Sequence, residues 1–338
     1  MNQFAEVTSQ PFGVADELIP GVFRVRLPLD FQEDHINVWV LCDGEDISII
    51  DTGVGTPETQ ELWSTILEKQ FSDRPLRRVI CTHWHPDHMG CASWLLTRAR
   101  EKLWITKREW QAAQRVVGGG SEQHLRDEER LLQLAGCDED FMRKVIDRSG
   151  YIAAHFLPPP DHYERFRCDD ALDIDGHAWL AILGEGHSPE HAALYSASRN
   201  VLIGGDMVLP DTATFVGIDS GEFLDDDPID LYLQGLQRLK ELPEDVLVLP
   251  SHGEPFVGLH NRIDELEAKM NRRLKRTLEA LTGPMPAATL VKALASRKPS
   301  ASQLYLGIRS TVACLNYHWV RQAVSRTEDA GVYFYGHT

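Results

Sequence analysis

The feature that most constrains this chain is a cluster of metal-ligand side chains in residues 83–88. Four of these six positions carry an imidazole or a carboxylate: His83, His85, Asp87 and His88. Imidazoles and a carboxylate this closely spaced are typical of a metal site. The cluster follows a strand-like segment at residues 78–81 and precedes a helix expected from Met89. It therefore lies at the carboxyl end of a strand, where α/β folds tend to place chemistry.

Three more ligand types follow other strand-like segments. His187 comes after residues 178–183, Asp206 after residues 201–204, and His252 after residues 246–249. Glycine lies beside each of them, which lets another part of the backbone approach closely. One histidine beside glycine is more often a turn residue than a ligand. The argument therefore rests on the whole set and its order.

The set resembles the metallo-β-lactamase superfamily through all five of its motifs. The motifs correspond to Asp51-Thr52-Gly53, His83 to His88, His187, Asp206 and His252, so the resemblance covers about residues 20–256. It implies an α/β fold, the αββα sandwich, with two metal ions. One ion would be bound by His83, His85 and His187, and the other by Asp87, His88 and His252. Asp206 would bridge the two ions, and Asp87 and Asp206 are the expected catalytic residues.

The resemblance also implies a metal-dependent hydrolase. Two divalent cations about 3.5–4 Å apart lower the pKa of a shared water, so that a bridging hydroxide attacks the substrate. Zinc is the default ion for these ligands, with Fe or Mn as alternatives. The segment around His187, Gly-His-Ser-Pro-Glu-His, and the aspartate at position 206 resemble glyoxalase-II-type thioesterases more than antibiotic-degrading lactamases. The expected substrate is a small-molecule ester, thioester or lactone, although no basic cluster like that of glutathione-specific relatives is evident.

Three further polar residues are expected near the ligands. Asp51 has no place among the ligands, so it is expected to accept hydrogen bonds that orient them, with a turn carboxylate as the alternative. His191 is expected to support the site rather than to bind metal. His35 precedes a strand and is either a substrate-side group or a capped turn residue.

The chain is long enough for a main domain and a smaller one, since it has 338 residues with 43% hydrophobic composition. We expect a catalytic domain at residues 1–258 and a winged-helix-like domain at residues 259–338. The latter is expected from helices near 262–281, 287–295 and 303–324, followed by a ribbon at 331–335. A helical insertion is expected at about 92–165, and its position over the metals as a lid or a channel wall stays open. Its aromatic residues would line a pocket or fill the core: Trp94, Trp104, Trp110, Phe141, Tyr151 and Phe156.

Charge is distributed unevenly along the chain. The net charge of −17 disfavours broad attraction to nucleic acid or anionic lipid. Residues 260–338 nevertheless carry 12 Lys and Arg against 6 Asp and Glu, whereas residues 1–259 carry 22 against 45. This C-terminal segment resembles the winged-helix appendage of some superfamily members, including a mitochondrial ribonuclease.

That likeness supports an alternative function, a metal-dependent nuclease acting on single-stranded RNA or DNA. The basic run would then contact phosphates through Lys269, Arg272, Arg273, Lys275 and Arg276. Otherwise the run is a solvated helix face paired with Asp264, Glu265 and Glu267, or a docking surface, for instance in a homodimer. An iron-dependent sulfur dioxygenase is a second alternative function, and a non-enzymatic metal-binding scaffold is a third.

The remaining features concern location. The six cysteines are scattered without a CxxC pair, which fits reduced thiols packed as small apolar residues: Cys42, Cys81, Cys91, Cys137, Cys168 and Cys314. No uncharged apolar run reaches the roughly 18 residues needed to span a bilayer, and residues 1–6 lack a signal-peptide pattern. We therefore expect a cytoplasmic protein that does not bind membranes.

Overall fold

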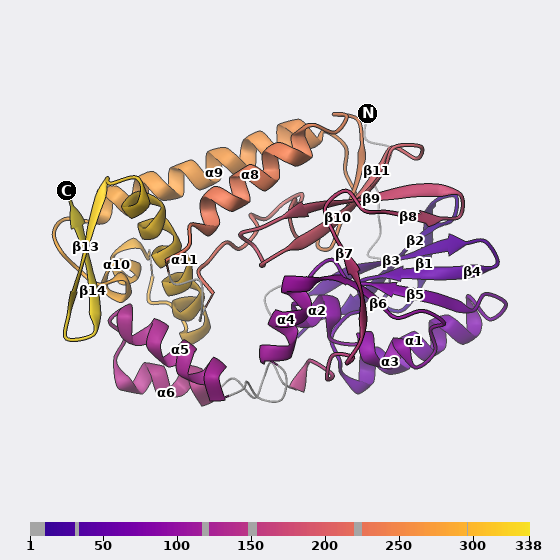
Figure 1. Ribbon diagram of the computed structural model, residues 1–338, viewed down its shortest axis with the longest axis horizontal. Coiled ribbons are helices and arrows are strands. Elements are labelled where there is room, and N and C mark those ends of the chain that lie inside the picture. The colour runs from indigo at the N-terminus through magenta and orange to yellow at the C-terminus, as the bar shows by residue number, and fades with distance from the viewer. Residues whose placement is uncertain (1–10, 31–33, 117–121, 148–153, 220–224, 296) are drawn as a thin grey trace.

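Two stacked β-sheets with helices on their outer faces form the main body of the chain (Figure 1). The computed structural model describes residues 11–30, 34–116, 122–147, 154–219, 225–295 and 297–338. This arrangement confirms the predicted αββα sandwich. Labels of helices and strands follow Figure 1.

The first sheet has seven strands in chain order: β1 (Ala15–Ile19), β2 (Val22–Pro28), β3 (His35–Asp43), β4 (Asp46–Ile50), β5 (Leu76–Ile80), β6 (Leu103–Thr106) and β7 (Tyr163–Phe166). Neighbouring strands from β1 to β4 are antiparallel, and those from β4 to β7 are parallel. The central strands β3 and β4 are almost entirely buried. Burial on both faces explains their nearly continuous apolar sequences.

The second sheet has five strands: β8 (Ala171–Ile174), β9 (His177–Gly184), β10 (His191–Ser196), β11 (Val201–Gly205) and β12 (Leu247–Pro250). Strand β10 is antiparallel to both β9 and β11, and β11 is parallel to β12. Hence β9, β11 and β12 end at the same edge. The two sheets share one core, in which Trp39 and Ile80 from the first sheet pack with Trp179 and Leu194 from the second.

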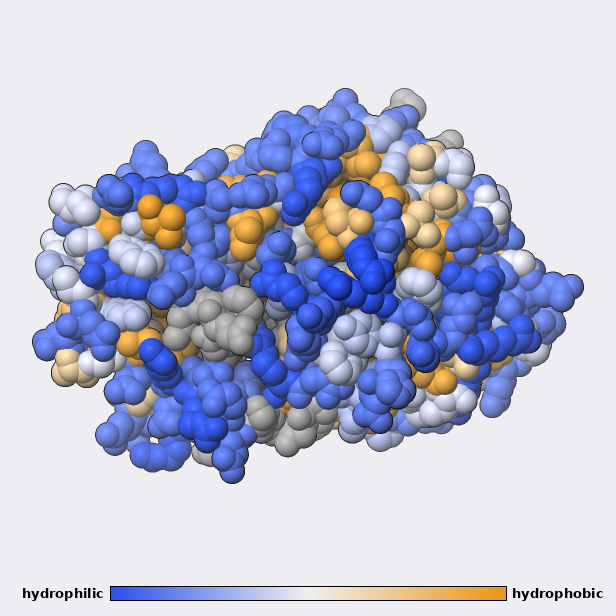
Figure 2. Space-filling view, viewed as in Figure 1, coloured by the Kyte–Doolittle hydropathy of each residue, from blue (hydrophilic) through white to orange (hydrophobic). Residues whose placement is uncertain are grey.

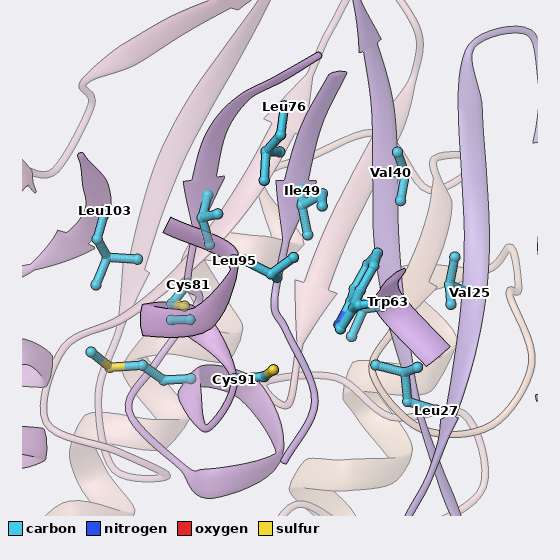
Figure 3. Packing of buried hydrophobic residues seen from close by; sticks show 14 of the residues in the cluster. Val25, Leu27, Val40, Ile49, Trp63, Leu76, Cys81, Cys91, Leu95 and Leu103 are labelled. Carbon is cyan, nitrogen blue, oxygen red and sulfur yellow. The ribbon is translucent and has the colours of Figure 1, made fainter. Parts of the chain in front are cut away.

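Helices cover both outer faces of the sandwich. The first sheet packs against α1 (Pro57–Lys69), α2 (Pro86–Met89), α3 (Ala92–Leu96) and α4 (Lys107–Val116), with Trp63 and Leu95 among the buried residues (Figure 3). The second sheet packs against α8 (Pro228–Lys240) and α9 (Leu259–Ala280) through residues such as Tyr232 and Ile263. Helix α1 begins as the sequence predicts, with the Thr56 hydroxyl accepting from the Thr59 N–H and Pro57 in the first turn.

The C-terminal segment continues from α9 into α10 (Ala287–Leu294), α11 (Ala301–Val320) and a hairpin of β13 (Val324–Asp329) and β14 (Val332–His337). The three predicted helices and the ribbon are present. The ribbon starts at Val324, where the sequence predicted the end of the third helix. The helix ends earlier because Gln322 adopts a left-handed backbone, with φ of 59°.

Residues 92–165 are less helical than the sequence predicted, because β6 and most of β7 lie within them and belong to the first sheet. The apolar segment Leu103–Thr106 fills a sheet position there. Helices α5 (Glu122–Leu134) and α6 (Glu139–Asp147) pack with α10, α11 and the hairpin. They lie beside the C-terminal elements in Figure 1.

Most large apolar side chains are buried, and the face shown in Figure 2 is mainly hydrophilic. Among the described residues, the exposed large hydrophobic side chains are those of Phe12, Val14, Val257 and Val320. Scattered exposed residues of this kind are ordinary for a globular protein. Among the described residues, no helix combines the length and apolar character that crossing a membrane requires.

Trp63 gives a test of the packing between α1 and the first sheet. Its side chain is fully buried, and its indole N–H donates to the Thr52 carbonyl at 2.8 Å. We expect Trp63→Ala to lower the free energy of unfolding by about 3–5 kcal/mol, because it leaves a cavity and an unpaired carbonyl. Trp63→Phe should cost less, since the ring still fills most of the space. Urea unfolding of both variants measures the difference, and equal losses would contradict this account.

Candidate metal centre

Four strands deliver the seven predicted ligands to one edge of the sandwich. The segment His83–His88 follows β5 and continues into the first turn of α2. His187 lies between β9 and β10, Asp206 directly follows β11, and His252 follows β12. The strands therefore bring together residues that are up to 169 positions apart in the sequence.

The seven side chains form two groups. Within each group, the ligand atoms lie within 4.8 Å of one another. His83, His85, His187 and Asp206 make up the first group, and Asp87, His88 and His252 the second. In the first group, His83 Nε2 lies 2.9 Å from His85 Nδ1 and 3.2 Å from His187 Nε2. In the second group, Asp87 Oδ2 lies 3.4 Å from His88 Nε2 and 3.3 Å from His252 Nε2.

Asp206 lies between the two groups. Its Oδ2 is 3.4 Å from His187 Nε2, while its Oδ1 is 3.4 Å from His88 Nε2 and 3.6 Å from His252 Nε2. Each carboxylate oxygen thus faces a different group. This is the placement that a carboxylate bridging two cations requires.

Contacts on the outer side fix the orientation of the imidazoles. His88 Nδ1 lies 2.8 Å from the Asp51 carboxylate, which also accepts from the Thr82 N–H at 2.8 Å. His187 Nδ1 contacts the Phe215 carbonyl and His252 Nδ1 the His35 carbonyl, each at 2.8 Å. Partners of this kind hold the opposite ring nitrogen toward a metal. Asp51 therefore occupies the supporting position expected from the sequence.

Burial and charge act differently on the two groups. Burial lowers the pKa of His83 well below its ordinary value and that of His85 to about 3, which favours the neutral imidazole that coordinates cations. Burial also opposes the charge on His252, but Asp206 and Asp87 raise its pKa to about 9. His88 is raised well above its ordinary pKa, because Asp87, Asp206 and Asp51 outweigh its burial. The carboxylates therefore stabilise positive charge at the second group.

The donor set fits divalent cations. His88 Nε2 and Asp206 Oδ1 are buried, and neither has a hydrogen-bond partner in the described part of the chain. Unpaired buried polar atoms are costly unless another group satisfies them. Five imidazoles with two carboxylates suit zinc, and also iron or manganese.

Glu109 was not identified from the sequence, yet it connects the two loops that carry His83, His85 and His187. Its fully buried carboxylate accepts from the Ser188 hydroxyl at 2.7 Å, the Glu190 N–H at 2.6 Å and the Trp84 N–H at 3.1 Å. Burial raises the pKa of Glu109 to about 7, against these hydrogen bonds. The sequence signal is a single carboxylate on the apolar face of α4, spaced with Ala112, Ala113 and Val116.

His191 and His35 have supporting positions. His191 Nε2 accepts from the Asp206 N–H at 3.2 Å and belongs to neither ligand group. Gly205 permits this contact, because a Cβ there would lie 2.2 Å from His191 Nε2. His35 contacts Asp34 through Nδ1 and orients His252 through its backbone carbonyl. The His35 side chain does not line the cavity beside His85 and His187.

A cavity of about 820 Å³ opens onto His85, Asp87 and His187. Its apolar wall includes Trp84, Phe215, Ile218, Leu231, Tyr305 and Leu306. Part of this wall comes from α11, so the C-terminal helices help to form the pocket.

The aromatic residues that the sequence offered as pocket lining pack in the core instead. Trp94, Trp110 and Phe156 pack beside the first sheet, Trp104 between the sheets, and Phe141 beside α11. Tyr151 lies outside the described residues. The core interpretation is therefore correct for the five described residues.

The family model of the metallo-beta-lactamase superfamily matches residues 32–252, which include all seven ligands. The chain belongs to the metallo-beta-lactamase superfamily. It is a hydrolase of this fold, as the sequence predicted.

Curated relatives of this superfamily chain include hydrolases. An atrochrysone carboxyl ACP thioesterase of Cryptosporiopsis sp. is 36% identical over 279 residues, covering 82% of this chain and 67% of the relative. A probable metallo-hydrolase of Bacillus subtilis is 26% identical over 261 residues, covering 75% of this chain and 77% of the relative.

Solved structures of the metallo-beta-lactamase superfamily extend the likeness to the C-terminal segment. A beta-lactamase domain protein from Burkholderia ambifaria is 32% identical, with a TM-score of 0.85, and the match covers 99% of this chain and 98% of that one. A family protein from Thermus thermophilus, 24% identical with a TM-score of 0.77, matches 95% of this chain and 100% of its own. The latter match shows a shared fold alone.

Substitution of Glu109 tests whether it holds the two ligand loops together. Glu109→Ala leaves two backbone N–H groups and a hydroxyl without their acceptor, so we expect metal affinity to fall roughly 10–100-fold. Glu109→Gln keeps one acceptor oxygen and should lose less. Metal affinity is measured by competition with a chromogenic chelator, and Glu101→Ala, on the other side of β6, serves as the control. Wild-type affinity in Glu109→Ala would contradict the role assigned to this residue.

Proposed function

We propose that this hydrolase cleaves a small-molecule ester, thioester or lactone, preferentially a thioester, with two divalent metal ions held by the seven ligands. The observation that carries the proposal is the Asp206 carboxylate, whose two oxygens face the two ligand groups at 3.4 Å. Zinc is the proposed ion. The thioesterase among the relatives supports the choice of thioester.

The chemistry of the proposed site follows from its donors. Two bound divalent cations supply an activated water as nucleophile and polarise the carbonyl under attack. The chain provides the arrangement for this chemistry: His83, His85 and His187 on one side, Asp87, His88 and His252 on the other, with Asp206 between them. In this proposal Asp87 and Asp206 are catalytic because they would hold the cations that activate the water.

The pocket wall provides the substrate contacts. Trp84, Phe215 and Leu231 line the cavity that reaches His85 and Asp87. We assign this wall to the acyl group, because apolar side chains bind an apolar acyl chain and exclude bulk water. Arg108 is held by the Glu185 carboxylate at 2.7 Å and lies in the same wall. It provides a donor at the polar side of the pocket.

The proposal also includes the domain boundaries and the subgroup of the superfamily. We assign the catalytic domain to residues 1–258, with its insertion at about 92–165, and a winged-helix-like domain to residues 259–338. The resemblance to glyoxalase-II-type thioesterases is also part of it. The C-terminal helices have a role in this proposal, because Tyr305 and Arg309 of α11 line the pocket.

Replacement of Asp206 tests the two-metal site. We expect wild-type protein to bind about two metal ions per chain and Asp206→Ala to lose at least one of them together with hydrolysis. The physical reason is that both groups share this carboxylate. Elemental analysis after dialysis measures the content, and His177→Ala, a histidine on β9 bonded to Ser198, is the control. Full metal content in Asp206→Ala would contradict the bridging assignment.

A substrate panel tests the proposed reaction. We expect chelator-sensitive hydrolysis of aryl esters, lactones and acyl thioesters, with the highest kcat/KM for a thioester. Cleavage is followed by thiol release and by product chromatography. Cleavage of single-stranded RNA without ester turnover would instead favour the nuclease alternative. One iron per chain with oxygen uptake would favour the sulfur dioxygenase.

A further inference from the structure

A second cavity, of about 480 Å³, lies among α9, α10 and the N-terminal half of α11. We call it the arginine groove. It is lined by Arg273, Arg276, Thr277, Val291, Leu294, Ala295, Arg297, Pro299, Gln303, Gly307, Ser310 and Thr311. The lining contains three guanidinium groups, three hydroxyl groups and no carboxylate.

The arginines of the groove have no carboxylate partner in the described part of the chain. Among the described residues, no carboxylate oxygen lies within 4.0 Å of the side-chain nitrogens of Arg273, Arg276 or Arg297. Arg276 donates a long hydrogen bond, 3.4 Å, to the Leu294 carbonyl. Three positive charges in one concave site attract an anion. Phosphate suits such a site, because a guanidinium group can donate two parallel hydrogen bonds to it.

The acidic residues expected to pair with the basic run have other partners. Asp264 contacts Lys240, Glu265 contacts Arg262 at 2.6 Å, and Glu267 accepts from Gln237. Of the alternatives for the basic run, pairing with these three acidic residues is therefore wrong. The arginines that face the groove keep their charge available in a chain whose net charge is −17.

The arginine groove adjoins the metal pocket. Gln303 lines both cavities. Pro299 lines the groove and Ser302 the metal pocket, so the two cavities meet across the first turn of α11. A ligand that passes this turn has to cover roughly the 10–12 Å width of one helix.

We propose that the arginine groove binds the phosphate end of a phosphopantetheine thioester, while its acyl group occupies the metal pocket. This inference rests on the proposed thioesterase function and names the thiol that leaves. The flexible pantetheine arm crosses at Gln303, whose amide N–H can donate to the arm's carbonyls, while its amide oxygen accepts from the Ser300 N–H at 3.0 Å. A coenzyme A thioester and a thioester on a carrier protein both contain phosphopantetheine, so the proposal includes both.

The reaction on this substrate is hydrolysis, and it balances without an additional reactant. Water adds to the acyl carbon, the bond between carbon and sulfur breaks, and the sulfur leaves with a proton. The products are a carboxylic acid and the free phosphopantetheine thiol. The groove contacts only the thiol half, so it sets which thiol is accepted and leaves the choice of acyl group to the metal pocket.

Two substrates that carry the same acyl group test the proposal by kinetics. One is the octanoyl thioester of coenzyme A, and the other is the octanoyl thioester of N-acetylcysteamine, which lacks the phosphate. In Arg276→Glu/Arg297→Glu, we expect kcat/KM for the first to fall at least about tenfold, mainly through KM. The value for the second should stay within about twofold of wild type, because that substrate does not reach the groove.

The matched control is Lys275→Glu/Lys292→Glu, which makes the same change in net charge at exposed positions of α9 and α10 outside the groove. It should retain the wild-type preference for the coenzyme A thioester. An equal loss in both double variants, or no change in the substrate ratio in Arg276→Glu/Arg297→Glu, would overturn the proposal. A larger effect on an octanoyl carrier protein than on the coenzyme A thioester would identify the carrier-bound form as the ligand.

Binding without turnover separates this inference from the proposed function. S-methyl-coenzyme A has no thiol for the metals, and its binding to metal-loaded protein is measured by calorimetry. We expect wild type and the lysine control to bind it with an affinity that falls as salt rises, and Arg276→Glu/Arg297→Glu to bind much more weakly. No binding by wild type, or displacement only by a single-stranded RNA, would overturn the proposal. Binding without any thioester hydrolysis would refute the proposed function alone.

Discussion

The burial of seven ligand side chains against one another is the interaction on which the rest of the structure depends. Two carboxylates and five imidazoles meet in a site where Asp206 Oδ1 and His88 Nε2 have no hydrogen-bond partner among the described residues. Such a cluster is unfavourable by itself, because desolvated polar atoms remain unpaired. The surrounding fold holds it together from outside. Asp51 and two backbone carbonyls orient ligand imidazoles, and Glu109 holds the loops that carry other ligands. The two sheets bring four strand ends to the same edge.

The same dependence extends to the C-terminal helices. His187 is oriented by the Phe215 carbonyl, and the segment that carries Phe215 is fixed to α11. Arg309 on α11 contacts Asp219 at 2.9 Å, and its carbonyl accepts from the Ile218 N–H at 3.0 Å. Arg309 also reaches Glu128 of α5 at 3.1 Å, so α5, α11 and the segment near His187 form one partly buried network. The C-terminal elements thus support a ligand as well as lining the pocket.

The ligands could be predicted from the sequence because they occur in short segments with a recognisable pattern. His83, His85, Asp87 and His88 are nearly adjacent, and His187, Asp206 and His252 each follow a recognisable strand beside glycine. The pocket could not be predicted in this way. Phe215, Tyr305 and Trp84 line it through contacts between distant segments, whereas the aromatics of the supposed lid pack in the core. Strand β6 was missed because a four-residue strand between helices has too short a pattern to establish its period.

The distribution of charge can be understood from the two cavities. The sequence shows a basic C-terminal segment on an acidic chain, and the structure places its arginines in different surroundings. Arg262 is buried and Arg309 is half-buried, and both are bonded to carboxylates, so they serve packing. Arg276 and Arg297 are exposed and face a concave site without a carboxylate in its lining. A general attraction to polyanions would need charges spread along a surface, as backbone phosphates are. Charges gathered in a groove that shares Gln303 with the metal pocket instead favour one small anionic group attached to the substrate.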